Sequence, residues 1–149
     1  MKNNKQVLSD LLLTQELMHA SRSGWHYIEN HFMDYSLSTI SYNILLITYI
    51  FDGISQESIS KSIKMDKSSV AKVVNKLIRM ELMHKTLNSD DRRMYNLHVT
   101  DAGKIICDKL IKCFEEWQSM VLGEISKEEI EVFFNTLAKI NLNIEEKNL

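Results

Sequence analysis

The chain contains no proline and only four glycines among its 149 residues. Proline and glycine are the residues that most readily end or bend a helix, so little in this sequence interrupts one. Apolar residues also recur at the three- and four-residue spacing of a helix face through most of the chain. These features predict a mainly α-helical protein.

The first long helix is expected over about residues 5–33. Its apolar residues repeat every seven positions, and three further residues widen the stripe. A helix this long cannot bury so continuous a stripe against one small domain, so we expect it to meet a partner helix. The stripe consists of Leu8, Leu11, Leu12, Met18, Trp25, Ile28 and Phe32.

Three shorter helices follow, at about 38–51, just after Ser55, and at about 67–80. The Asp52-Gly53 pair ends the first of them. Ser55 and Asp66 are suited to cap the second and third, because their side-chain oxygens accept hydrogen bonds from free helix N–H groups. A short helix, a tight turn and a second helix form a helix-turn-helix pattern.

The period of the sequence then changes once. Apolar Tyr95, Leu97 and Val99 alternate with the residues between them, which is typical of a half-buried strand. Residues 83–87 are its expected antiparallel partner, with residues 88–93 as the loop. The chain is therefore expected to be mainly α with one small β-hairpin.

Helical spacing resumes at about residue 101, after Thr100 as the cap, and the run from Ser126 to Glu129 is a capping box that opens a last helix. Both helices carry an apolar stripe that we expect to be buried. The stripes are Ile105, Ile106, Leu110, Phe114, Trp117 and Val121 in the first, and Ile130, Phe133, Phe134, Leu137 and Ile140 in the second.

Positive charge is concentrated in one window of the sequence, although the net charge is −2. Residues 61–93 carry nine Lys or Arg against four Asp or Glu, whereas the segments on either side are acidic. A local excess of this kind is typical of a surface that binds a polyanion.

The helix at 67–80 presents small and cationic side chains opposite its apolar face. At 100° per residue, Ser68, Lys72, Asn75 and Arg79 share that side. Hydroxyls and lysines can hydrogen-bond base edges, and lysine and arginine neutralise phosphates. An amphipathic surface helix with an ordinary cationic side is the alternative. Ser69 and Lys76 flank the face.

Residues 56–104 resemble the winged helix-turn-helix core of the MarR family of bacterial transcriptional regulators. The resemblance rests on a Ser-Ser-Val recognition helix, a leucine pair, a D-x-R wing and a Val-Thr-x-x-Gly helix start. These motifs are Ser68-Ser69-Val70, Leu77 and Leu82, Asp91-Arg92-Arg93, and Val99-Thr100 with Gly103. Two positions depart from the family: Glu81 stands where a glycine is usual before the hairpin leucine, and Ala71 stands where many members have a hydroxyl.

The resemblance implies that double-stranded DNA is the partner. Ser68, Ser69, Lys72 and Lys76 would then meet the major groove or adjacent phosphates. On the wing, Arg93 would enter the minor groove, braced by Asp91, and Arg92 would meet phosphate. A narrow minor groove favours an inserted arginine by its negative potential. An exposed salt-bridged turn is the alternative for this charge cluster.

The family also implies a homodimer on a palindromic operator, most often acting as a repressor. Residues 1–149 would form one domain, with a DNA-binding core at about 38–100 and dimerisation helices at about 1–35 and 101–149. A two-fold dimer predicts half-sites about one helical turn apart.

Many family members respond to a small aromatic effector, which could bind in a cleft lined by Trp25, His26, His31 and Tyr35. Burial of several of these residues in the core or the interface is the alternative. The two cysteines, Cys107 and Cys113, are interpreted as small core residues rather than redox sensors. No cofactor is implied, and the five histidines lack the spacing of a metal site.

Other functional classes find less support in the sequence. We find no phosphate-binding glycine loop, nucleophile motif or readable carboxylate pair, so no enzymatic activity is expected. No apolar run reaches the ~20 residues of a membrane span, and a cytoplasmic protein is expected. A winged-helix protein that binds another protein stays the alternative function, although lysine is depleted at the core of protein interfaces.

Overall fold

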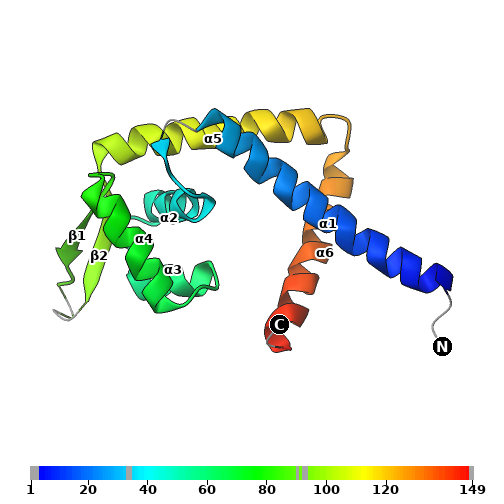
Figure 1. Cartoon of the computed structure of the whole chain (residues 1–149), viewed down its shortest axis with the longest axis horizontal. Coiled ribbons are helices and arrows are strands. Elements are labelled where there is room, and N and C mark those ends of the chain that lie inside the picture. Colours follow the sequence, from blue (N-terminus) through cyan, green and yellow to red (C-terminus); the bar gives the residue numbers. More distant parts are fainter. Residues whose placement is uncertain (1–3, 33–34, 90, 92–93, 148–149) are drawn as a thin grey trace. The chain divides into compact units, whose positions relative to one another are not determined.

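The computed structural model describes residues 4–32, 35–89, 91 and 94–147, with side chains from residue 11 onward. The described elements confirm the predicted fold class, mainly α with one antiparallel hairpin (Figure 1). Their order is α1 (Asn4–His31), α2 (Thr39–Ile50), α3 (Gln56–Ser62), α4 (Lys67–Arg79), β1 (Met83–Leu87), β2 (Tyr95–Val99), α5 (Asp101–Leu122) and α6 (Lys127–Glu146).

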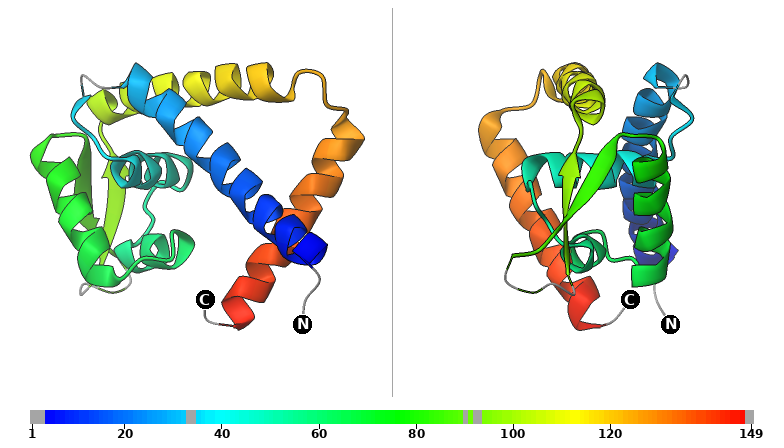
Figure 2. Two further views of the ribbon diagram at one scale, coloured as in Figure 1. Left: turned by 45° about the vertical axis from the view of Figure 1, so that its right-hand side comes forward. Right: turned by 90° about the vertical axis from the view of Figure 1, so that its left-hand side faces the viewer.

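The chain divides into two compact units, Met1–Glu115 and Glu116–Leu149. The first contains α1 to α4, the hairpin and most of α5, and Figure 2 shows its α3, α4 and hairpin in two views. The second contains the end of α5 and all of α6.

Side chains at the predicted positions start the helices of the first unit. The Ser55 hydroxyl accepts a hydrogen bond from the Ser58 N–H at 3.1 Å, and the Asp66 carboxylate accepts one from the Ser69 N–H at 2.9 Å. The Thr100 hydroxyl accepts one from the Gly103 N–H at 3.1 Å. Each bond satisfies a helix N–H that has no partner within its own helix. The three predicted caps are confirmed.

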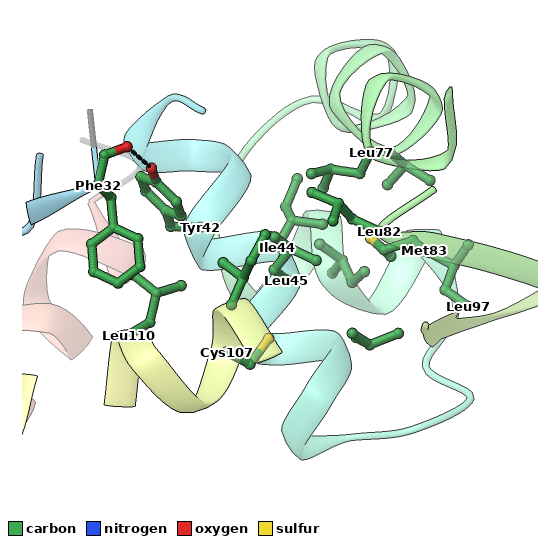
Figure 3. Packing of buried hydrophobic residues seen from close by; sticks show 14 of the residues in the cluster. Phe32, Tyr42, Ile44, Leu45, Leu77, Leu82, Met83, Leu97, Cys107 and Leu110 are labelled. Carbon is green, nitrogen blue, oxygen red and sulfur yellow. Dashed lines mark hydrogen bonds between the residues drawn. The ribbon is translucent and has the colours of Figure 1, made fainter. Parts of the chain in front are cut away.

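One hydrophobic core joins the elements of the first unit (Figure 3). The end of α1 enters it through Phe32, whose carbonyl accepts a 3.0 Å hydrogen bond from the buried Tyr42 hydroxyl. That bond satisfies the polar end of a ring that is otherwise enclosed by apolar groups. Other core side chains come from α2, α4, the hairpin and α5, among them Ile44, Leu45, Leu77, Met83, Leu97, Cys107 and Leu110.

The two strands pair over the predicted segments, from Met83 opposite Val99 to Leu87 opposite Tyr95. Leu97 and Val99 are buried, but the Tyr95 side chain is 45% exposed, so its expected burial is wrong. The physical reason is its place at the first residue of β2, the end of the strand that adjoins the wing loop rather than the core. Alternation identified the inward face of the strand but not how far along the strand the core extends.

The buried stripe of α5 differs in part from the prediction. Ile106 and Leu110 are buried as expected, but Ile105 is 58% and Val121 44% exposed. The side of α5 that is buried carries Gly103, Ile106, Cys107, Leu110 and Cys113. Ile105 precedes Ile106 by one position, which rotates its side chain by about 100° away from that side.

The stripe of α6 is half-buried or exposed rather than buried. The capping box at Ser126 and Glu129 is present as predicted, but α6 has no buried residue, and Phe133 and Phe134 are 55% and 71% exposed. Periodicity correctly identified an apolar face. The expected burial is not reached within this single chain, and the face lies in the segment that the sequence assigns to dimerisation, residues 101–149.

Candidate nucleic-acid interface

A helix-turn-helix forms the centre of the candidate site. α3 ends in a tight turn in which Lys64 has a positive φ of 52°, and the Met65 N–H donates to the Ser60 carbonyl at 3.1 Å. Val70, Val74 and Leu77 bury the inner face of α4 in the core. Burial of this face fixes which side of α4 is turned to solvent, and that side carries the predicted DNA contacts.

The first turn of α4 is organised around Asp66. Its carboxylate accepts hydrogen bonds from the Ser68 hydroxyl at 2.6 Å and from the Ser69 N–H at 2.9 Å. These bonds, the Ser68 hydroxyl first, hold the pKa of Asp66 well below its usual range. The charged carboxylate therefore already satisfies the positive end of the helix, and the exposed Ser68 hydroxyl has oxygen lone pairs left for an external donor.

The two lysines predicted to contact DNA differ in their surroundings. Lys72 is exposed on the solvent side of α4, as are Asn75 and Arg79. Lys76, one turn further along, is half-buried, and its Nζ donates a 3.1 Å hydrogen bond to the carbonyl oxygen of Ser36 in the α1–α2 linker. The structure thus brings Ser68, Lys72, Asn75 and Arg79 together on one open face and directs Lys76 toward the protein.

Hydrogen bonds from Asn88 close the described part of the wing loop. Its N–H donates to the Met94 carbonyl at 3.0 Å, and its side-chain oxygen accepts from the Asp91 N–H at 2.9 Å. Its amide nitrogen also donates to the Asn96 side chain at 2.9 Å. Asp91 is half-buried in this loop. Arg92 and Arg93, the other predicted wing contacts, lie outside the described residues.

Glu81 ends α4 as the usual glycine would, because it adopts the left-handed conformation with a φ of 59°. The Leu82 N–H donates to the Leu77 carbonyl and the Glu81 N–H to the Ile78 carbonyl, both at 3.0 Å. This is the Schellman pattern of a helix C-terminus. The Thr100 hydroxyl further fixes the Glu81 carbonyl, at 2.7 Å.

Sequence reasoning missed part of the surface beside α4. A hollow of about 250 Å³ lies between α3, α4 and the hairpin, and its lining includes Gln56, Asn75, Lys85 and Tyr95. The Lys85 ammonium lies 4.6 Å from the centre of the Tyr95 ring, a cation–π contact across the strands. The strand register could have predicted this pair, since the two residues are diagonal neighbours when Leu87 faces Tyr95.

The four predicted effector-cleft residues have separate surroundings. Trp25 packs edge-on against Phe114, with ring centres 5.9 Å apart. The Tyr35 hydroxyl accepts a 2.9 Å hydrogen bond from Lys109 of α5. His26 lines a shallow hollow on α1, and His31 is exposed with its Nδ1 2.7 Å from the Tyr27 carbonyl oxygen. An effector cleft formed by these residues stays a prediction.

Both cysteines, which the sequence assigns to the core, are buried. Cys107 is fully buried, and burial, with a smaller effect of Asp108, raises the pKa of its thiol to about 12. The thiol is therefore protonated at neutral pH and is a poor nucleophile. Cys113 is buried as well. Within the described ranges, no group of three His, Cys, Asp or Glu could hold a metal ion.

None of the helices that the structure describes is both long and apolar enough to cross a membrane.

The described elements define a winged helix-turn-helix protein, with α4 in the position of the recognition helix and the β1–β2 hairpin in that of the wing. The family model of MarR matches residues 37–95, which include α2, α3, α4, β1 and the first residue of β2. This match confirms the resemblance of the DNA-binding core to the MarR family.

Several known regulators are similar to the chain. It is 28% identical over 88 residues to the HTH-type transcriptional regulator BilQ of Clostridium symbiosum. This match covers 59% of the chain and 61% of BilQ, so the chain spans less than two thirds of the length of BilQ. A MarR transcriptional regulator from Methanosarcina mazei has a TM-score of 0.75 at 25% identity and covers 93% of this chain and 99% of its own. A putative MarR family regulator from Listeria monocytogenes, solved with a 26mer DNA, has a TM-score of 0.82 at 19% identity, with coverage of 90% and 89%.

Proposed function

We propose that the chain is a sequence-specific, DNA-binding transcriptional regulator. The observation that carries the proposal is the open face of α4, where Ser68, Lys72, Asn75 and Arg79 are exposed while the opposite face is buried in the core. A helix with small and cationic side chains on its free side fits a major groove about 12 Å wide. The Listeria monocytogenes relative, which was solved with DNA, supports the same use of this fold.

Each predicted contact then has a distinct task. Ser68 and Ser69 offer hydroxyls to base edges or phosphates, and Lys72 neutralises phosphate or meets a base. Arg93 enters the minor groove from the wing, Asp91 braces it, and Arg92 meets phosphate. The hydrogen bonds of Asn88 to Asp91 and Met94 support this assignment only in that they order the described part of the wing loop.

The active form is proposed to be a homodimer on a palindromic operator. Large apolar side chains are exposed along the second unit, and a second copy of the chain would remove them from water. The exposed stripe of α1 supports the same arrangement. These side chains are Leu11, Leu12, Leu13 and Met18 on α1, and Met120, Val121, Ile125, Phe133, Phe134 and Leu142 in the second unit.

Repression relieved by a small aromatic effector is the proposed mode of regulation, as is usual in the family. Trp25 and Tyr35 support it, because both are half-buried aromatic residues at the junction of α1, α5 and the α1–α2 linker. An aromatic ligand that displaced either ring would disturb the contacts that α1 and the α1–α2 linker make with α5.

The experiment that tests the proposal is selection of a binding site from a random pool of DNA duplexes, followed by affinity measurements on the enriched sequence. We expect a palindromic consensus and a dimer bound to it. Arg93→Ala should weaken binding and leave the dimer intact by sedimentation. No enriched sequence would refute the DNA-binding proposal and favour a protein partner, whereas unchanged affinity of Arg93→Ala would refute the assignment of the wing contact alone.

A further inference from the structure

We infer that Lys76 is a positioning residue of the recognition helix rather than a DNA contact: it ties α4 to the α1–α2 linker through the Ser36 carbonyl. The inference rests on the proposed DNA-binding function. It changes the role of a residue whose type, charge and place in the sequence all favour direct contact with phosphate.

The surroundings of the lysine side chain carry the first step. Lys76 and Lys72 are four residues apart and so share one side of α4, but Lys72 is exposed and Lys76 is half-buried. The Lys76 Nζ lies 3.1 Å from the carbonyl oxygen of Ser36, a residue 40 positions earlier in the chain. A charged donor makes a stronger hydrogen bond to a carbonyl than a neutral donor does, and this exposed contact directs the ammonium toward the linker.

The backbone of the linker carries the second step. Ser36 has a positive φ of 49°, in the left-handed region that residues other than glycine seldom adopt. Such a conformation persists only where surrounding contacts hold it. Contacts on both sides do so here, since Lys109 donates to the Tyr35 hydroxyl at 2.9 Å and Lys76 to the Ser36 carbonyl. The next residues start α2, where the Ser38 carbonyl accepts from the Tyr42 N–H.

These contacts tie α4 and α5 to the two linker residues between α1 and α2. The linker leads from α1, is held by α5 at Tyr35 and by α4 at Ser36, and opens α2. A change in the linker would therefore reach the recognition helix through one side chain. Removal of the Lys76 side chain should make the linker more mobile and the orientation of α4 less restricted. It should not remove a charge from the DNA interface itself.

The salt dependence of DNA binding separates the two roles of lysine. A protein that neutralises one phosphate fewer has a slope of log K against log salt that is shallower by about 0.9 in B-DNA. We expect Lys72→Met to make the slope shallower by about that amount. Lys76→Met should weaken binding roughly fivefold at every salt concentration, as expected when one hydrogen bond is removed. Its change in slope should be less than half of the change that Lys72→Met causes. Lys76→Arg keeps a cationic donor and should restore most of the affinity.

Hydrogen exchange on the free protein gives a readout that needs no DNA. Lys76→Met should speed exchange at residues 36–42, whereas Lys72→Met should leave it unchanged. A slope as shallow as that of Lys72→Met, or unchanged exchange in the linker, would overturn the inference. Failure of the proposed function looks different, because the wild-type protein itself would then bind no duplex selectively, and the exchange data would still report whether Lys76 holds the linker.

Discussion

Replacing Glu81 by glycine should stabilise the protein. Glu81 has a φ of 59° at the C-terminus of α4, where glycine adopts the conformation without a Cβ penalty. The left-handed conformation costs an ordinary residue about 1–2 kcal/mol, and glycine gives back about 0.5–1 kcal/mol through the larger entropy of its unfolded state. The backbone effect of Glu81→Gly is therefore a gain of about 0.5–1 kcal/mol.

A second effect has the same sign. The Glu81 side chain places a negative charge next to the negative end of the α4 dipole, which at an exposed position costs about 0.3–1 kcal/mol. Together the two effects predict that Glu81→Gly raises the free energy of unfolding by ~1 kcal/mol. For a chain of this length that corresponds to a rise of about 3 °C in Tm.

The assay is thermal unfolding followed by circular dichroism at one fixed protein concentration. Glu81→Gln is the matched control, because it removes the charge and keeps the Cβ. We expect it to gain only the smaller, electrostatic part. A Glu81→Gly protein that is no more stable than Glu81→Gln would refute the claim that the left-handed backbone at residue 81 is strained.

Three further predictions concern stability and reactivity. A Cβ at Gly103 would overlap the Leu82 carbonyl oxygen and the Val99 side chain. Gly103→Ala should therefore lower the free energy of unfolding, measured in denaturant, by about 3 kcal/mol. A decrease below ~1 kcal/mol would contradict that packing. Asp66→Ala should destabilise the protein at neutral pH, because it removes the N-cap of α4. Folding lowers the pKa of Asp66, so its contribution to the free energy of unfolding is complete above the ordinary pKa of ~4 and is lost as the pH falls further. A stability difference between the wild type and Asp66→Ala that stayed constant down to about pH 2.5 would contradict the assignment. Cys107, with a pKa raised to about 12, should react with a maleimide only as the protein unfolds, and rapid labelling of the native protein at this position would show that the thiol is accessible.

Local chemistry made much of the fold predictable from the sequence. The caps at Ser55, Asp66 and Thr100 depend on residues three positions away, and the hairpin depends on an alternation within one short segment. Interactions of this range leave a pattern in the sequence itself. The predicted elements and the structure therefore agree closely from α2 to β2.

Contacts between distant residues left no such pattern. The bond from Lys76 to Ser36 joins positions 40 apart, and nothing in the recognition helix distinguishes Lys76 from Lys72. The stripe on α6 gives a similar lesson, since periodicity shows that Phe133 and Phe134 share an apolar face but not what covers it. Glu81 adopts a glycine conformation because the bonds from Leu82 and Thr100 outweigh its local preference.

The most direct test of the central claim is the affinity of the wild-type protein for the selected duplex and for a scrambled duplex of the same length, across a series of salt concentrations. The account predicts that the selected duplex binds at least about 10³-fold more tightly at physiological salt. Affinity for both duplexes should fall steeply as the salt concentration rises. Equal affinity for the two duplexes would contradict sequence-specific recognition by α4 and the wing.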